Sequence, residues 1–230
     1  MTDFKAEAAK AALPLISAGH VIGLGAGTTI ARLVDLIRQS DLAESVTFVS
    51  SSFKTNGYLQ KSGLKVQSPS MLEKLDIYFD GCDQFDADLN ALKSGGGIHT
   101  QEKILASMAA GFILIGDEGK YTDKLDNSFP LVVEILPQAL HVVMKRLASL
   151  FPGADIMLRM SDRKDGAVIS ENGNLLADIS FAVLPDLQTL NTQVKMIPGI
   201  VEHSLFYRMA AKAIIAGANG VRILLPAYRR

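Results

Sequence analysis

The chain has 230 residues, a length that fits one large α/β domain or a main domain with a smaller partner. Its 23 basic and 24 acidic side chains give a net charge of −1, which excludes the global positive field typical of nucleic-acid-binding proteins. No window approaches the roughly 18 uninterrupted apolar residues of a membrane span. The first residues lack the charged start and apolar run of a secretory signal, so we expect a cytoplasmic protein.

Metal and disulfide chemistry are also not expected. Cys82 is the single cysteine, and the four histidines are scattered without metal-ligand spacing. The sequence therefore predicts neither an internal disulfide nor a structural metal ion.

The first half of the chain alternates between strand-like and helical patterns. Alanine and leucine recur at helical spacing over residues 4–18, and a second helix is expected over Ile30–Arg38. Short buried strands are expected at residues 20–24, Val46–Val49, Leu75–Phe79 and Phe112–Ile115. This alternation predicts an α/β fold with a parallel sheet covered by helices.

The pattern changes after Asp126. Strands are expected at Leu131–Leu136, Asp155–Met160, Ala167–Ser170 and Leu175–Val183, with a helix over Gln138–Leu150. We interpret this stretch as a small inserted α+β domain, with residues 1–127 and 203–230 forming the main domain and residues 128–202 the small one. A helix around Phe206–Ile215 and a strand over Val221–Leu225 then return the chain to the first sheet.

The first candidate site segment is a glycine turn at the end of the first expected strand. It contains Gly25, Ala26, Gly27, Thr28 and Thr29. Backbone N–H groups of such a turn, together with the start of the following helix, can bind an anion. The turn is neither a Walker loop nor a complete dinucleotide-binding motif. A tight turn capped by threonine is an equally reasonable interpretation of this segment alone.

Three more segments follow expected strands or open an expected helix. They are Asp80–Gly81–Cys82–Asp83, then Lys93–Ser94–Gly95–Gly96–Gly97 leading to a helix with Glu102, and Asp117–Glu118–Gly119–Lys120. In an open parallel sheet, ligands bind at the carboxyl ends of the strands, so these segments are expected to meet in one crevice. Each alone could be a solvated or backbone-bonded turn, but four together predict a functional site.

In this order and spacing, the segments resemble the ribose-5-phosphate isomerase type A family. Further similarity is found at residues 51–55, 130–134, 171–178 and 197–202, so the resemblance covers nearly the whole chain. It implies a Rossmann-like sheet with the active site, an inserted ferredoxin-like domain, and a homodimer or homotetramer. It also implies interconversion of ribose 5-phosphate and ribulose 5-phosphate through an enediolate, without metal or other cofactor.

The resemblance also implies roles for individual residues. Glu102 matches the base that moves the proton between neighbouring carbons. Lys93 and the N–H groups of the glycine loop, residues 94–97, are expected to stabilise the developing oxyanion. Asp80 and Asp83 are expected to hold sugar hydroxyls and to assist ring opening. The expected substrate- and phosphate-binding residues are Lys5, Gly25, Ala26, Gly27, Thr28, Thr29, Gly81, Cys82, Ser94, Gly95, Gly96 and Lys120.

Three neighbours of these residues depart from the family pattern. Ala26 stands where threonine is usual, Ser94 replaces glycine, and Gln84 stands where glutamate is usual. These changes keep open an isomerase that acts on another aldose phosphate. Two further alternatives are a non-catalytic sugar-phosphate sensor, for which the chain has no room for a DNA-binding module, and an acyl-CoA transferase that forms a thioester on Glu102.

Overall fold

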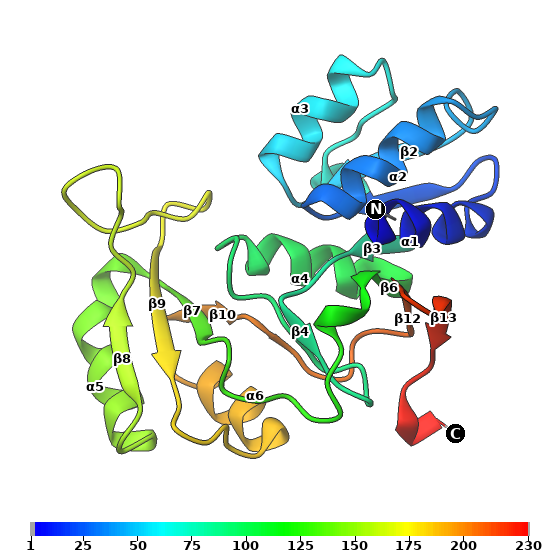
Figure 1. Cartoon of the computed structure of the whole chain (residues 1–230). Helices are drawn as coiled ribbons and strands as arrows, with labels where there is room; N and C mark the ends of the chain where they lie inside the picture. The colour runs from blue at the N-terminus through cyan, green and yellow to red at the C-terminus, as the bar shows by residue number, and fades with distance from the viewer. Residues whose placement is uncertain (1–2, 230) are drawn as a thin grey trace.

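The computed structural model describes residues 3–229 (Figure 1). Its largest sheet has six strands. The strand order is β13-β12-β6-β3-β1-β2, and every neighbouring pair is parallel except the antiparallel pair β12 and β13. The strands are β1 (Val21–Leu24), β2 (Thr47–Ser50), β3 (Leu75–Asp80), β6 (Ala109–Asp117), β12 (Lys212–Gly217) and β13 (Gly220–Leu224). This sheet confirms the predicted mostly parallel α/β fold.

Helices cover both faces of this sheet because its strands are apolar on both sides. The helices are α1 (Phe4–Ala12), α2 (Thr28–Arg38), α3 (Phe53–Lys61) and α4 (His99–Met108). Residues of α1 and α2 pack with Ile113 and Ile115 of β6, whereas α4 packs with Phe112 and Leu114, which point to the opposite face. The alternation along one strand thus divides the interior into two apolar clusters.

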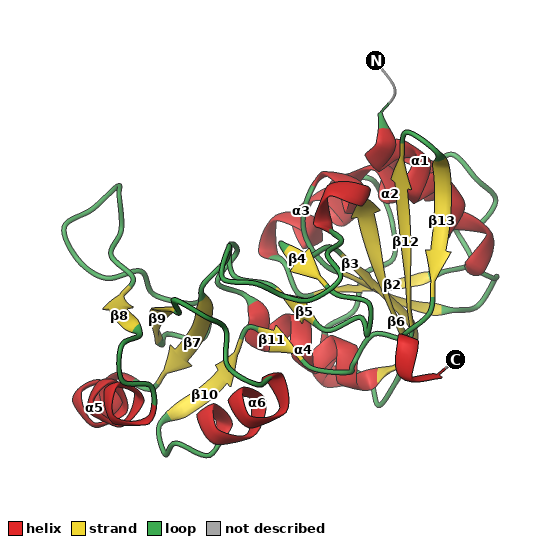
Figure 2. Cartoon of the chain, turned by 60° about the horizontal axis from the view of Figure 1, so that its bottom comes forward, coloured by secondary structure: helices red, strands yellow, loops and turns green. Residues whose placement is uncertain are grey.

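A second, four-stranded sheet has the connectivity β7-α5-β8-β9-α6-β10 and the strand order β10-β7-β9-β8. Its elements are β7 (Leu131–Ile135), α5 (Leu140–Leu150), β8 (Asp155–Leu158), β9 (Leu175–Ser180), α6 (Leu187–Lys195) and β10 (Ile200–His203). All of its strand pairs are antiparallel, and both helices pack on one face, as Figure 2 shows. This is the ferredoxin-like arrangement that the resemblance implies.

Short elements complete the chain. A three-stranded sheet joins β4 (Gln84–Phe85), β5 (Ala91–Leu92) and β11 (Leu205–Phe206), and 3-10 helices occur at Leu13–Leu15, Pro69–Met71, Glu118–Lys120, Pro137–Ala139 and Ala227–Arg229. The predicted domain boundaries at 127/128 and 202/203 stay a prediction. The second boundary falls within β10. None of the helices within residues 3–229 combines the length and the hydropathy of a membrane-spanning segment.

One predicted element is wrong. The helix expected around Phe206–Ile215 does not form; β11 ends at Phe206, and β12 begins at Lys212. The alanines of this segment favour a helix by propensity, but β12 lies between β6 and β13 with its residues 213–217 buried. Pairing on both edges and burial on both faces outweigh a propensity of a few tenths of a kcal/mol per residue.

Two smaller differences concern element lengths. The helix expected over residues 4–18 ends at Ala12 and continues only as the 3-10 turn Leu13–Leu15, with Pro14 inside it. The strand expected at Ala167–Ser170 is reduced to isolated bridges, from Ala167 to Met160 and from Ile169 to Leu175.

Candidate functional site

A cavity of about 280 Å³ lies at the carboxyl ends of β1, β3 and β6. All four predicted catalytic side chains line it: Asp80, Asp83, Lys93 and Glu102. Nine predicted binding residues also line it, namely Lys5, Ala26, Gly27, Thr28, Thr29, Gly81, Cys82, Gly96 and Lys120. The parallel sheet therefore brings together segments that are far apart in the sequence, as expected from the common direction of its strands.

The centre of the cavity wall is one buried cation between two buried carboxylates. The Lys93 Nζ atom lies 2.9 Å from Oδ2 of Asp80 and 3.2 Å from Oε1 of Glu102, and it also donates to the Gly81 carbonyl oxygen. Lys93, Asp80 and Glu102 are each at most 7% exposed. Because burial makes each charge dependent on the others, the three side chains act as one electrostatic unit.

This environment moves the pKa of both Lys93 and Glu102. Burial raises the pKa of Glu102 to about 8; the Lys93 charge opposes this rise and the Asp80 charge adds to it. Burial by itself would lower the pKa of Lys93, but the charges of Asp80 and Glu102 outweigh burial and raise it. The site thus combines a lysine that stays cationic with a carboxyl group that titrates near neutral pH.

Asp80 connects the end of β3 to the glycine turn after β1. Its Oδ1 atom accepts from the backbone N–H groups of Ala26, at 3.2 Å, and Gly81, at 2.8 Å, and its Oδ2 atom accepts from the Tyr78 hydroxyl at 2.5 Å. A Cβ atom on Gly25 would lie 1.8 Å from Oδ1 of Asp80, which explains the glycine there. Gly25 therefore shapes the site without lining the cavity.

Asp83 holds the loop that follows β5. Its Oδ2 atom accepts from the backbone N–H groups of Ser94 at 2.6 Å and Gly95 at 2.9 Å. Ser94 and Gly95 were predicted to bind substrate, but they do not line the cavity, and their N–H groups are occupied by Asp83. Gly96 lines the cavity, and the described residues include no acceptor for its N–H group.

The opposite end of the cavity is suited to an anion. The N-terminus of α2, which begins at Thr28 after Gly27, has no side-chain cap, and Gly27 has a φ of +102°, which favours glycine. Lys120, in the 3-10 turn after β6, and Lys5 of α1 line the same cavity. Within residues 3–229 neither lysine has an ion-pair partner, so two cations and a helix N-terminus remain available for a bound anion.

The sequence did not identify four residues that line this cavity: Ile98, Ile115, Gly116 and Asp117. Asp117 belongs to a segment already singled out, whereas Ile98 and Ile115 carry no polar signal. Cys82 also lines the cavity, and burial raises the pKa of its thiol to about 12, so it stays protonated at neutral pH.

Two of the three side chains that depart from the family pattern make contacts outside the cavity. The Gln84 side chain donates to Oδ1 of Asp126 at 2.8 Å, and the Ser94 hydroxyl donates to the Pro130 carbonyl oxygen at 2.5 Å. Neither side chain lines the cavity, whereas Ala26 does. Ala26 is therefore the departure with a direct bearing on what the cavity binds.

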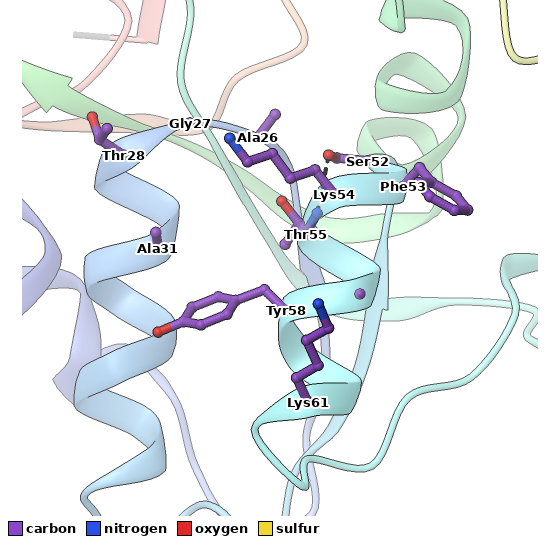
Figure 3. Close-up of a pocket in the computed structure, with 11 residues that line it drawn as sticks. Ala26, Gly27, Thr28, Ala31, Ser52, Phe53, Lys54, Thr55, Tyr58 and Lys61 are labelled. Carbon is purple, nitrogen blue, oxygen red and sulfur yellow. Dashed lines mark hydrogen bonds between the residues drawn. The ribbon is translucent and has the colours of Figure 1, made fainter.

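A larger cavity of about 660 Å³ lies between α2 and α3 and shares Ala26, Gly27 and Thr28 with the first one. Figure 3 shows Lys54 extending from α3 toward the turn at Ala26 and Gly27, and Tyr58 reaching toward α2. None of the four predicted catalytic side chains lines this larger cavity. We therefore place the candidate reaction site in the smaller cavity.

Another buried carboxylate, Glu134 of β7, holds the start of helix α4. It accepts from the Thr100 hydroxyl in the first turn of α4, and from Ser170, Asn172 and Asn174 of the loop before β9. Burial opposes the ionised form of Glu134, but these four donors outweigh burial and lower its pKa. The four-stranded sheet thereby fixes the turn of α4 that carries Glu102.

Lys103, beside Glu102, ties α4 to the chain after α6. Its ammonium group donates to Oε1 of Glu202 at 2.9 Å and to the carbonyl oxygens of His203 and Leu205 at 2.7 and 2.9 Å. Burial lowers the pKa of Lys103 to about 8, although the Glu202 charge opposes this shift. Lys103 points away from the cavity that Glu102 lines, so its contribution is to the position of α4.

Comparison with known proteins identifies relatives over most of the chain. Residues 47–220 match the family model of ribose 5-phosphate isomerase A (phosphoriboisomerase A). The ribose-5-phosphate isomerase A of Thermosynechococcus vestitus is 38% identical over 212 residues, which cover 90% of this chain and 89% of that protein. The corresponding protein of Methanothermobacter thermautotrophicus is 38% identical over 226 residues, which cover 96% and 97%.

Solved structures agree with this result. The ribose 5-phosphate isomerase A of Methanocaldococcus jannaschii superposes with a TM-score of 0.89 at 34% identity, covering 97% of this chain and 98% of that one. A D-ribose-5-phosphate isomerase in complex with phospho-erythronic acid superposes with a TM-score of 0.89 at 32% identity, covering 98% and 100%.

Proposed function

The chain belongs to the ribose 5-phosphate isomerase A family, and we propose accordingly that it interconverts D-ribose 5-phosphate and D-ribulose 5-phosphate through an enediolate. The observation that carries this proposal is the buried Glu102 carboxyl group 3.2 Å from the Lys93 ammonium group at the wall of the 280 Å³ cavity. Aldose–ketose isomerisation needs a base that moves one proton between adjacent carbons, and a cation beside the oxygen that becomes negative.

Glu102 is the base in this proposal. It removes the proton from C2, next to the C1 carbonyl group, and returns it to C1, while the hydroxyl proton on O2 passes to O1, so no external proton donor is consumed. Burial raises the pKa of Glu102 to about 8, and a carboxylate with such a pKa is a stronger base than one exposed to water. Low water access also limits exchange of the transferred proton with solvent.

Lys93 and the Gly96 N–H group stabilise the enediolate oxygen. Lys93 stays cationic throughout, because the neighbouring carboxylates raise its pKa. Asp80 holds Lys93 in place through their ion pair. The remaining positions around the Asp80 oxygens are occupied by the Tyr78 hydroxyl and by backbone N–H groups. Asp83 is partly exposed at the cavity and contacts the sugar hydroxyls, which assists ring opening.

The phosphate group of the substrate binds at the other end of the cavity. Thr28 and Thr29 supply hydroxyl and backbone donors at the start of α2, and Lys120 and Lys5 supply positive charge. Ala26 offers no hydroxyl group at this position. The preference among aldose phosphates depends on this end of the cavity, and an isomerase for another aldose phosphate is the alternative that Ala26 favours.

The proposal extends to the setting of the enzyme. No cofactor is required, because the proton transfer uses only side chains of the cavity. We place the enzyme in the cytoplasm as a homodimer or homotetramer, as the family resemblance implies. Sedimentation or light scattering of the purified protein tests the oligomeric state directly.

The experiment that tests the reaction is a coupled assay of ketose formation from ribose 5-phosphate without added metal, comparing wild type with Glu102→Gln. Both proteins are first shown to be folded by circular dichroism. Turnover by the wild type and a loss of several orders of magnitude in the variant support the proposal. A folded wild type without turnover overturns the named substrate, and an active Glu102→Gln variant overturns the assigned base.

A further inference from the structure

One peptide unit of the glycine loop is hydrogen-bonded on both sides. The N–H group of the Ser94–Gly95 peptide donates to Oδ2 of Asp83 at 2.9 Å, on the side of the catalytic cavity. The carbonyl group of the same peptide accepts from Nη2 of Arg159 at 2.9 Å, on the side of the four-stranded sheet. The orientation of this peptide plane therefore depends on a residue more than 60 positions later in the chain.

Arg159 is itself held firmly. It follows β8 and donates through Nε to both carboxylate oxygens of Asp178 on β9, at 3.0 and 3.1 Å, and through Nη2 to Oδ1 at 2.5 Å. The Arg159 side chain is 18% exposed and the Asp178 side chain 30% exposed. A planar guanidinium group with several donors fits this arrangement, whereas the single ammonium group of a lysine cannot reproduce it.

The four-stranded sheet also constrains the backbone of the glycine loop at Gly97, two residues after Gly95. Gly97 has a φ of +66°, and a Cβ atom built on it would lie 2.7 Å from Cδ1 of Leu176 on β9 and 3.7 Å from Nη1 of Arg159. The loop thus lies directly against β9 and Arg159. Lys93, at its other end, is fixed by the backbone hydrogen bond from its N–H group to the Ser204 carbonyl oxygen at 3.0 Å.

We propose that Arg159, supported by Asp178, is a positioning residue for the reaction: it orients the Ser94–Gly95 peptide and, through it, Asp83 and the cavity side of the glycine loop. Arg159 does not line the catalytic cavity, so it acts only through the loop. This inference rests on the proposed isomerase function. It assigns to the inserted domain a direct part in the geometry of the active site.

The physical consequence is a separation between catalysis and phosphate binding. The proposed phosphate end of the cavity is built from α2, Lys5 and Lys120, and among residues 3–229 the hydrogen-bond and ion-pair partners of Arg159 are Ser94 and Asp178 instead. Loss of the guanidinium group is therefore expected to lower kcat by about 10² and to change KM by less than about threefold, since small misplacements of catalytic groups cost about that much in rate.

The test compares Arg159→Met, Arg159→Lys and Asp178→Asn with a matched control, Arg163→Met. Arg163 is an exposed arginine in the same loop, four residues away, so its removal changes the net charge equally. The expected order of kcat is wild type and Arg163→Met highest, Arg159→Lys and Asp178→Asn intermediate, and Arg159→Met lowest. Thermal unfolding of each variant shows whether the protein remains folded under assay conditions.

Two further measurements separate positioning from general destabilisation. In Arg159→Ala, guanidinium chloride at low millimolar concentration is expected to restore at least part of kcat, whereas sodium chloride at equal ionic strength does not. Calorimetric titration with phospho-erythronic acid, the compound bound in the solved relative, is expected to show affinity within threefold of wild type for Arg159→Met if the phosphate end is intact.

The outcomes distinguish this inference from the proposed function. A wild type without isomerase activity overturns the proposed function. An active wild type with Arg159→Met equally active, or with KM raised and kcat unchanged, overturns the positioning role. A folded Arg159→Ala variant that guanidinium does not rescue also counts against it.

Discussion

Replacement of Lys93 by methionine tests the electrostatic description of the site, because it removes the single cation shared by two buried carboxylates. Lys93 Nζ lies 2.9 Å from Asp80 and 3.2 Å from Glu102, and these carboxylate residues are 1% and 5% exposed. Removing one partner of a buried ion pair costs about 3–5 kcal/mol. Methionine has a similar length, so the change leaves no large cavity.

The cost is expected to depend on pH. Burial already raises the pKa of Glu102 to about 8 in the wild type, above its ordinary value of 4.5. The stability contributed by a raised carboxyl pKa is fully present below the unfolded pKa and is lost as pH rises through the folded pKa. Without Lys93, ionisation of Glu102 has no compensating cation, so the loss above pH 8 is larger in the variant.

We therefore expect Lys93→Met to lower the free energy of unfolding by about 3 kcal/mol at pH 6, where Asp80 carries most of the unpaired charge, and by about 5 kcal/mol at pH 9. Urea unfolding followed by circular dichroism at both pH values measures this difference. The double variant Lys93→Met/Glu102→Gln is expected to recover part of the loss at pH 9 only.

Lys120→Met is the matched control, because Lys120 lines the same cavity and has no ion pair among residues 3–229. Its effect on stability is expected to stay within about 0.5 kcal/mol at both pH values. The reasoning fails if Lys93→Met costs less than about 1 kcal/mol, or if its cost is the same at pH 6 and pH 9.

Three further predictions concern Glu102, Gly25 and Glu134. In a plot of log kcat/KM against pH, the wild type is expected to rise with unit slope up to about pH 8 and to level off above it. The reason is that burial raises the pKa of Glu102 to about 8 and the ionised carboxylate is the proposed base. A flat pH–rate profile between pH 6 and 9 would contradict this. Gly25→Ala is expected to cost at least about 2 kcal/mol of stability and most of the activity, since the added Cβ atom would overlap the Asp80 carboxylate. Gly57→Ala is the control, because the space around Gly57 is open, and it is expected to keep both stability and activity. Thermal unfolding and the isomerase assay measure the two effects. Glu134→Gln is expected to lower the free energy of unfolding by about 1–3 kcal/mol at pH 7 and by less at pH 4. Hydrogen bonds lower the pKa of Glu134 in the folded protein, so the stability that its ionised form contributes is lost as pH falls. Urea unfolding at both pH values measures this difference.

The part of the site that the sequence predicts best is its strand-end loops. Asp80 follows the apolar residues 77–79, and the glycine turn follows the short strand Val21–Leu24, so the common direction of parallel strands predicts that they lie together. Glu102 is identified by a similar local pattern, because it lies in the first turn of a helix that follows three consecutive glycines. These residues are recognisable because their chemistry and their backbone constraints occur within a few positions of each other.

The remaining parts depend on long-range contacts that no local pattern contains. Segment 206–215 has the composition of a helix, yet β12 forms because β6 and β13 pair with it on both sides. Helix α6 (Leu187–Lys195) was not predicted, although its N-cap, Asp186, accepts from the Thr189 N–H group and provides a usable sequence signal. The contact from Arg159 to Ser94 spans 65 positions and has no local signal at all.

These contacts bear on why a small second sheet accompanies the main one. Glu102 lies on a helix whose first turn is held by Glu134, and the loop before that helix is held by Arg159; both residues belong to the four-stranded sheet or the loop beside β8. The glycine turn at residues 25–27 follows β1 of the six-stranded sheet, and Asp80 ends β3 of the same sheet. On the roles proposed above, contacts from the four-stranded sheet position the helix that carries Glu102, whereas the six-stranded sheet supplies the turn proposed to bind the phosphate group. A mutation in the four-stranded sheet is therefore expected to lower kcat more than it changes KM, and a mutation around α2 is expected to do the reverse.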